Sequence, residues 1–110
     1  MTPRMLGAWA IATHLTGGNL RRADLNYAYL AEANLQGADL TDANLRRANL
    51  CMANLQGANL QGADLWRADL RGCDLRGADM RDANVEEASW NGAQVGWART
   101  DGAGMKGVNP

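Results

Sequence analysis

Four aspartates stand five residues apart along the second half of the chain, at Asp64, Asp69, Asp74 and Asp79. A set of carboxylates is a candidate for general acid–base catalysis, in which one group donates a proton and another accepts it. No histidine lies near them in the sequence to share protons, because His14 is the only one in the chain. We therefore expect these aspartates to have a structural role.

Thiol and metal chemistry are also not indicated. His14 has no Cys-x-x-Cys pair beside it, so the sequence predicts no metal site. Cys51 and Cys73 lack a plausible base, and we interpret both as unpaired, which fits a reducing compartment. The sequence also lacks a phosphate-binding loop, so we predict no enzymatic activity, no cofactor and no small-molecule substrate.

The elements that carry these residues follow from a period of five. Leucine occupies every fifth position from Leu20 to Leu75, and the phase continues through Met80 to Val95 without insertion or deletion. Ala stands two residues before nearly every centre, and Asn or Asp stands one before, which gives the motif Ala-(Asn/Asp)-Leu-x-x. Such regularity indicates units that bury their apolar side chains only by stacking on one another.

Neither a helix nor a flat strand accommodates this period. Five residues advance about 500° around an α-helix, so the leucines would form no stripe. On a strand, leucines five apart would alternate between the two faces. The period therefore predicts short extended stretches joined by corners that wind into a solenoid. Gly at several second corner positions, such as Gly57 and Gly62, suits the positive φ of tight turns.

Residues 33–40 (Ala-Asn-Leu-Gln-Gly-Ala-Asp-Leu) and 53–60 (Ala-Asn-Leu-Gln-Gly-Ala-Asn-Leu) resemble the pentapeptide-repeat family. The resemblance covers residues 18–95. It implies an all-β fold, a right-handed quadrilateral parallel β-helix with four pentapeptides in each square coil. For this chain it implies about four to five coils, spaced ~4.8 Å apart, with residues twenty apart stacked vertically.

The resemblance also implies which side chains fill the interior. These are the central leucines together with the Ala two residues before each. The predicted core leucines are Leu20, Leu25, Leu30, Leu35, Leu40, Leu45, Leu50, Leu55, Leu60, Leu65, Leu70 and Leu75. Cys73 replaces an interior Ala, whereas Cys51 lies at an exterior corner. The short Asn and Asp side chains are expected to bond neighbouring backbone groups.

The two ends are expected to differ from the repeats, which span residues 18–97. Residues 1–17 are predicted to hold a short α-helix, over 3–16, that caps the first coil and so covers an open edge. The alternative for this apolar segment is an export signal; without it we expect a cytoplasmic protein. Residues 98–110 are expected to form an irregular coil or tail, with Trp90 plugging the core beside Trp97.

The outer surface must then carry the function, because the fold fills its own interior. Stacking by twenty places Arg46 and Arg47 over Trp66 and Arg67, and we call these four residues the interaction patch. Arginine beside an aromatic side chain is favoured at protein interfaces. The alternative is a solvated surface in which the arginines pair with nearby carboxylates.

The composition narrows the class of partner. The net charge is -1, so no strongly basic surface is indicated and nucleic acid is not expected as a partner. The sequence contains no run of eighteen apolar residues, so we expect no membrane-spanning helix. We expect a non-catalytic scaffold that binds an unidentified protein partner, or associates with itself through its ends. The alternative that the resemblance offers is a DNA-mimicking modulator of DNA gyrase, although this chain lacks the strongly negative charge of such mimics.

Overall fold

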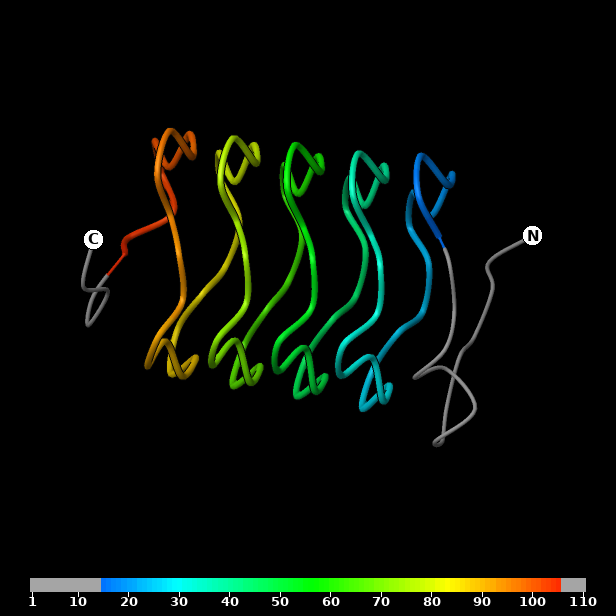
Figure 1. Cartoon of the computed structure of the whole chain (residues 1–110), viewed down its shortest axis with the longest axis horizontal. Coiled ribbons are helices and arrows are strands. Elements are labelled where there is room, and N and C mark those ends of the chain that lie inside the picture. The colour runs from blue at the N-terminus through cyan, green and yellow to red at the C-terminus, as the bar shows by residue number, and fades with distance from the viewer. Residues whose placement is uncertain (1–14, 106–110) are drawn as a thin grey trace.

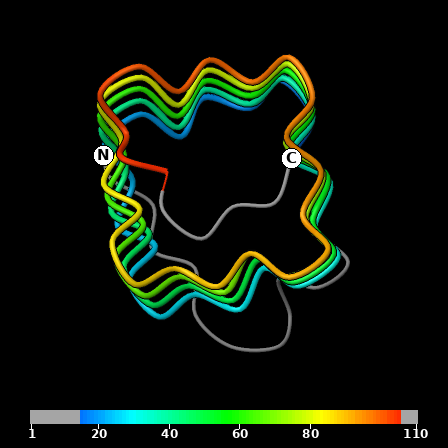
Figure 2. The same cartoon turned by 90° about the vertical axis from the view of Figure 1, so that its left-hand side faces the viewer.

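The computed structural model describes residues 15–105, and within them the backbone winds into successive stacked coils. Figure 1 shows the coils along the long axis, and Figure 2 shows their four-sided outline from one end. Parallel bridges join residues that are twenty apart, from Asn19 with Asp39 to Asp79 with Arg99. The molecule is a β-helix solenoid, and the predicted twenty-residue register is confirmed.

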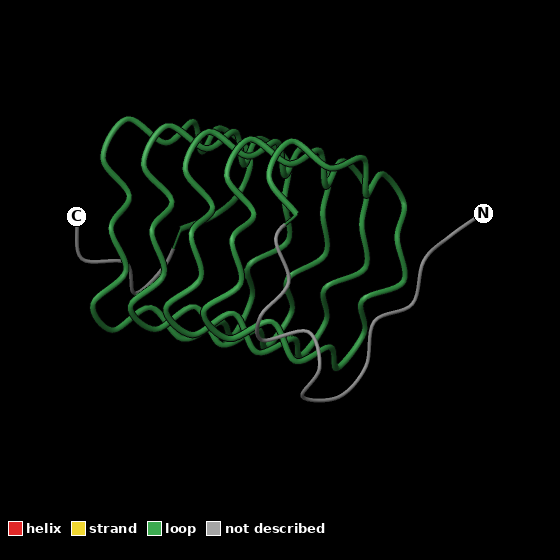
Figure 3. Cartoon of the chain, turned by 45° about the vertical axis from the view of Figure 1, so that its right-hand side comes forward, coloured by secondary structure: helices red, strands yellow, loops and turns green. Residues whose placement is uncertain are grey.

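Between residues 15 and 105 there is no helix and no continuous strand (Figure 3). Each bridge is isolated, with one bridging residue in every pentad. A turn follows each centre and ends the extended stretch: Ala53 N donates to Leu50 O at 3.0 Å, and Met52 between them has a φ of +62°. Of the four residues in this turn, only the third has a positive φ, as in a type II turn.

Positive φ is a property of the corner itself and does not depend on glycine. The second corner position of successive pentads has positive φ whether it holds Gly57, Arg47 or Glu87. Non-glycine residues enter this region at a steric cost of about 1–2 kcal/mol each. Glycine at a corner therefore avoids the steric cost of positive φ that arginine or glutamate has at the same position.

In a regular pentad all five backbone N–H groups are hydrogen-bonded. In the pentad that begins at Leu40, the five donors bond as follows: Leu40 N to Asn59 O (2.7 Å), Thr41 N to Asp39 Oδ1 (3.1 Å), Asp42 N to Gln61 O (2.9 Å), Ala43 N to Leu40 O (3.0 Å) and Asn44 N to Ala23 O (2.9 Å). Three of these bonds reach a neighbouring coil, one closes the turn, and one goes to a side chain. Because buried donors must be paired, the whole pentad is specified by hydrogen bonding as well as by burial.

The interior is filled by leucine and alanine. All twelve predicted core leucines are at most 6% exposed, and the alanines two residues before them are also buried. Leu15, five residues before Leu20, packs against the same core. In the described coils these side chains occupy the interior and support the outer surface.

Regular backbone extends beyond the limits that the side-chain consensus indicates. At the start, Leu15 N donates to Asn34 O (2.8 Å) and Gly18 N closes a turn on Leu15 O (2.8 Å). The helix predicted over residues 3–16 is therefore wrong at its last two residues, because Leu15 occupies a centre in phase with the repeat. The rest of that helix, within residues 1–14, lies outside the described residues.

The C-terminal part behaves similarly. Met80 N donates to Arg99 O (2.7 Å), and Ala103 N closes a turn on Thr100 O (2.9 Å). Coil geometry thus continues beyond residue 98, where the irregular segment is predicted to begin, because the bonding uses backbone atoms that any residue supplies.

The two late tryptophans do not share one environment. Trp90 is 6% exposed in a central position, and its indole Nε1 has no hydrogen-bond partner. Trp97 is 91% exposed at a second corner position with a φ of +57°. The expectation that Trp97 shares the plug is wrong, because side chains at that position point away from the core.

Candidate interaction site

The asparagines and aspartates before each centre stabilise the corners. Each of them from Asn19 to Asn84 accepts a hydrogen bond at Oδ1 from the backbone N–H two residues ahead; Asn59, for example, accepts from Gln61 N at 3.0 Å. Such Asx turns imitate a backbone turn. The structural role that we predict for these side chains is confirmed.

The four aspartates that could have formed a catalytic set are each held by an arginine. Asp69, Asp74 and Asp79 each form a two-point ion pair with the arginine two residues later, with one N–O distance of 2.7 Å in each pair. Asp64 instead pairs with Arg46, one coil away, at 2.9 Å. Hydrogen bonds to an ionised carboxylate favour its charged form, which suits support of the corners rather than proton transfer.

The pKa values follow from these pairs. The hydrogen bond from Arg76, opposed by partial burial, lowers the pKa of Asp74 to about 2. Arg71 and Arg81 likewise lower the pKa of Asp69 and Asp79. Each aspartate therefore stabilises the folded state in its ionised form.

We expect stability to fall as the pH is lowered from about 4 to about 2. A carboxyl with a lowered pKa contributes stability above its unfolded pKa of about 3.9 and loses it as the pH falls through the folded value. Urea unfolding at pH 7, 4, 3 and 2.5 measures the loss. The variant Arg71→Gln, Arg76→Gln, Arg81→Gln should show a shallower decline over that range; parallel curves for the two proteins would contradict this.

The interaction patch brings three guanidinium groups around one indole ring. The guanidinium carbons of Arg46, Arg47 and Arg67 lie 4.5, 4.9 and 4.6 Å from the centre of the Trp66 ring. Cation–π contacts of this length contribute about 0.5–1 kcal/mol at exposed sites. The structure thus brings all four predicted residues together, on one corner of two successive coils.

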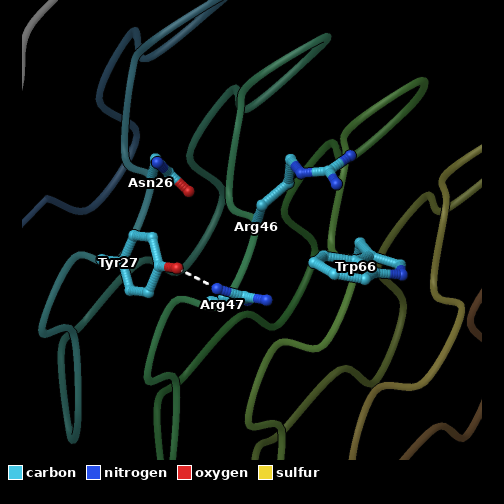
Figure 4. Close-up of a pocket in the computed structure, with 5 residues that line it drawn as sticks. All are labelled: Asn26, Tyr27, Arg46, Arg47 and Trp66. Atoms are coloured by element: carbon cyan, nitrogen blue, oxygen red, sulfur yellow. Dashed lines mark hydrogen bonds between the residues drawn. The ribbon is translucent and has the colours of Figure 1, made fainter.

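Tyr27 adds a second aromatic side chain at this corner. Arg47 lies with its guanidinium carbon 5.4 Å from the Tyr27 ring centre and donates a hydrogen bond to the Tyr27 hydroxyl. Figure 4 shows this bond, with Arg46 on the same coil as Arg47 and Trp66 on the next coil. These side chains and Asn26 line a shallow depression of about 250 Å³.

The ion pairs at the corner could have been found from a local rule. Where Asp stands two residues before an arginine, as at Asp69 and Arg71, the pair closes within one pentad. Where Asn stands there, as at Asn44, the arginine reaches an aspartate eighteen residues on, as Arg46 reaches Asp64. Arg21, which follows Asn19, reaches Asp39 in the same way at 3.4 Å. Only a carboxylate attracts the guanidinium group, so the residue two positions before the arginine decides whether the ion pair forms within the pentad or with the next coil.

Other reactive groups stay apart from this corner. Both cysteines are free; Cys73 is buried, and burial raises the pKa of its thiol. Across residues 15–105, no three His, Cys, Asp or Glu side chains come together as metal ligands would. The same part of the chain contains no helix that is long and apolar enough to cross a membrane.

Known proteins share both the repeat and the fold. A family model described as pentapeptide repeats matches residues 11–42, 19–53 and 53–92. A pentapeptide repeat protein from the Arabidopsis thaliana thylakoid lumen superposes with a TM-score of 0.82 at 26% identity, over 88% of this chain and 68% of its own. No protein of curated function matches by sequence.

Two bacterial structures are closer in sequence. A pentapeptide repeat protein from Nostoc Pcc 7120 is 44% identical, with a TM-score of 0.69, over 70% of this chain and 64% of that one. One from the cyanobacterium Cyanothece 51142 is 40% identical, with a TM-score of 0.55, over 76% and 54%. The chain thus spans less than two thirds of the length of these two relatives.

Proposed function

Because the chain belongs to the pentapeptide-repeat family, we propose that it is a non-catalytic scaffold that binds a protein partner through the interaction patch. The proposal rests on one observation: three arginines converge on Trp66 at a corner that faces solvent. Trp and Arg are the residues most often found to dominate binding energy at interfaces.

The rigidity of the corner supports this proposal. The backbone beneath the patch is fixed by inter-coil bonds such as Arg47 N to Trp66 O at 2.8 Å. Immobilising a mobile side chain on binding costs about 0.5–1.5 kcal/mol. Side chains that aromatic contacts and ion pairs already hold lose little rotamer freedom, so most of this cost is avoided. A shallow, prearranged surface of this kind suits a protein partner better than a small molecule.

A charge reversal with a matched control tests the proposal. Arg46→Glu with Arg47→Glu is expected to reduce capture of partners by the tagged chain in a cell lysate by about tenfold or more. Arg21→Glu with Arg22→Glu is the control, because it makes the same charge change at the same two pentad positions on another corner. If both variants capture the same proteins as the unaltered chain, the patch is not the binding surface.

We also propose the finer architecture that the resemblance implies, a right-handed β-helix of about four to five coils with a capping helix before it. The twenty-residue register and the four-sided outline in Figure 2 support the first part. A cytoplasmic location, which the free thiols suit, belongs to the same proposal.

The gyrase alternative receives no support from this surface. A protein that imitates DNA must present unneutralised negative charge, whereas Asp69, Asp74 and Asp79 are each paired with arginine. A supercoiling assay with titrated protein tests it directly. Inhibition or protection of gyrase at micromolar protein would favour mimicry over the scaffold that we propose.

A further inference from the structure

The charges at the patch corner are arranged symmetrically about Trp66. One coil before it stand Arg46 and Arg47, and one coil after it stand Glu86 and Glu87. The order is fixed by Arg47 N bonding to Trp66 O (2.8 Å) and Arg67 N bonding to Glu86 O (3.0 Å). Since neighbouring coils are about 4.8 Å apart, the positive and negative pairs lie at equal distances from Trp66.

This arrangement is complementary to itself in one orientation. Consider a two-fold axis that lies in the plane of contact, beside Trp66 and at right angles to the solenoid axis. It brings the patches of two copies face to face and reverses the order of the coils in the second copy. The arginine pair of one copy then faces the glutamate pair of the other, at both ends of the contact, and the two Trp66 side chains meet at the centre. A parallel arrangement would instead place arginine against arginine and glutamate against glutamate.

We propose that the interaction patch binds a second copy of this chain, in an antiparallel two-fold dimer centred on Trp66. The inference names the partner of the scaffold proposed above and rests on that function. Homo-oligomers most often use such isologous contacts, in which one surface meets itself.

Two charges at this corner that form no ion pair within one copy support this occupant. In residues 15–105, neither Arg47 nor Glu86 takes part in an ion pair. In the dimer Arg47 faces Glu87 of the second copy, and Glu86 faces Arg46. Arg67 faces its own counterpart, but each Arg67 retains the Glu87 of its own copy at 3.0 Å.

Charge-swap variants test the dimer by sedimentation equilibrium of the full chain. Arg46→Glu with Arg47→Glu places four glutamates together at each end of the contact, and Glu86→Arg with Glu87→Arg places four arginines there. Each variant alone should dimerise about tenfold or more weakly than the unaltered chain. An equal mixture of the two should restore the dimer, because the facing pairs at both ends of the contact are again of opposite charge. Arg21→Glu with Arg22→Glu serves as the control and should dimerise normally.

The outcomes separate this inference from the proposed function. If both variants associate as strongly as the unaltered chain, the inference is overturned; contact through the ends would give this result. A mixture that fails to restore the dimer also overturns it. If the unaltered chain is a monomer at all concentrations but captures other proteins through Arg46 and Arg47, the scaffold stands and the second copy is not its partner. Circular dichroism of each variant establishes that it is folded, so that a lost dimer is not a lost fold.

Discussion

Deletion of Gln56 alone is expected to abolish cooperative folding. Every centre after the deletion, from Leu60 onward, moves one position out of phase with the corner that should hold it. The shortened pentad also loses one of the five N–H donors that the coil uses, here the one from Gln56 to Asn54 Oδ1 at 3.0 Å. The in-phase remainder, residues 15–55, makes only about two coils, and stacked repeats need about three or more to be stable.

Deletion of residues 56–60 is the matched control and should leave a folded chain. It removes a whole pentad, so each remaining centre, alanine and Asx turn keeps its place in the period. It does change which corners stack, so Arg46 no longer lies over Trp66 and binding through the patch should be lost. Urea unfolding followed by circular dichroism compares the two deletions; equal stability of the two would contradict a five-residue unit.

Leu55→Ala is expected to lower the free energy of unfolding by about 2–5 kcal/mol, the cost of truncating a buried leucine. Leu55 has no exposed surface, and the twenty-residue register places Leu35 and Leu75 on the coils directly before and after it. The inter-coil backbone bonds hold these neighbours in place, so the cavity cannot collapse. This loss is a large part of the roughly 5–15 kcal/mol that stabilises a domain.

Met52→Ala provides the control for that prediction. Met52 is also a large apolar residue, but it lies at a corner and is 60% exposed. Its truncation should change the free energy of unfolding by no more than about 0.5 kcal/mol. If both variants lose equal stability in urea, the leucines are not the core.

The core and the register could be predicted because they depend on a repeated pattern. Every centre from Leu20 to Leu75 has the same role, so the period requires all of them to point the same way, and the family resemblance implied that they point inward and stack by twenty. The roles of Asn and Asp followed from the same regularity, since a short side chain at a fixed place before a turn has one backbone donor within reach.

The details of the corner depend on single residues and were only partly predictable. The stacking of Arg46, Arg47 and Trp66 follows from the register. The bond from Arg47 to the Tyr27 hydroxyl does not, because a long side chain at a corner chooses among several rotamers. The positive φ of Arg47 and Glu87 was also missed, because glycine at other corners pointed to a residue preference rather than to a shared geometry.

The ends were the least predictable part. Thr100 and Arg99 depart from the motif, yet the backbone of their pentad bonds to the coil before it, through Met80 N to Arg99 O at 2.7 Å. Hydrogen bonding between coils requires only main-chain atoms, so side-chain consensus underestimates how far a solenoid extends. Leu15, in contrast, carries the right residue in phase and could have been recognised as an earlier centre.

A disulfide between equivalent corners measures the stacking most directly. In a background of Cys51→Ser with Cys73→Ala, the pair Gln36→Cys and Gln56→Cys should oxidise readily. Gly37 N already donates to Gln56 O at 2.9 Å, and a coil spacing of about 4.8 Å lies within the roughly 4.4–6.8 Å between Cα atoms that a disulfide spans. The pair Gln36→Cys and Gln61→Cys, which lies on different corners, should remain reduced. A cross-link at 36–61, or none at 36–56, would contradict a solenoid in which residues twenty apart lie on neighbouring coils.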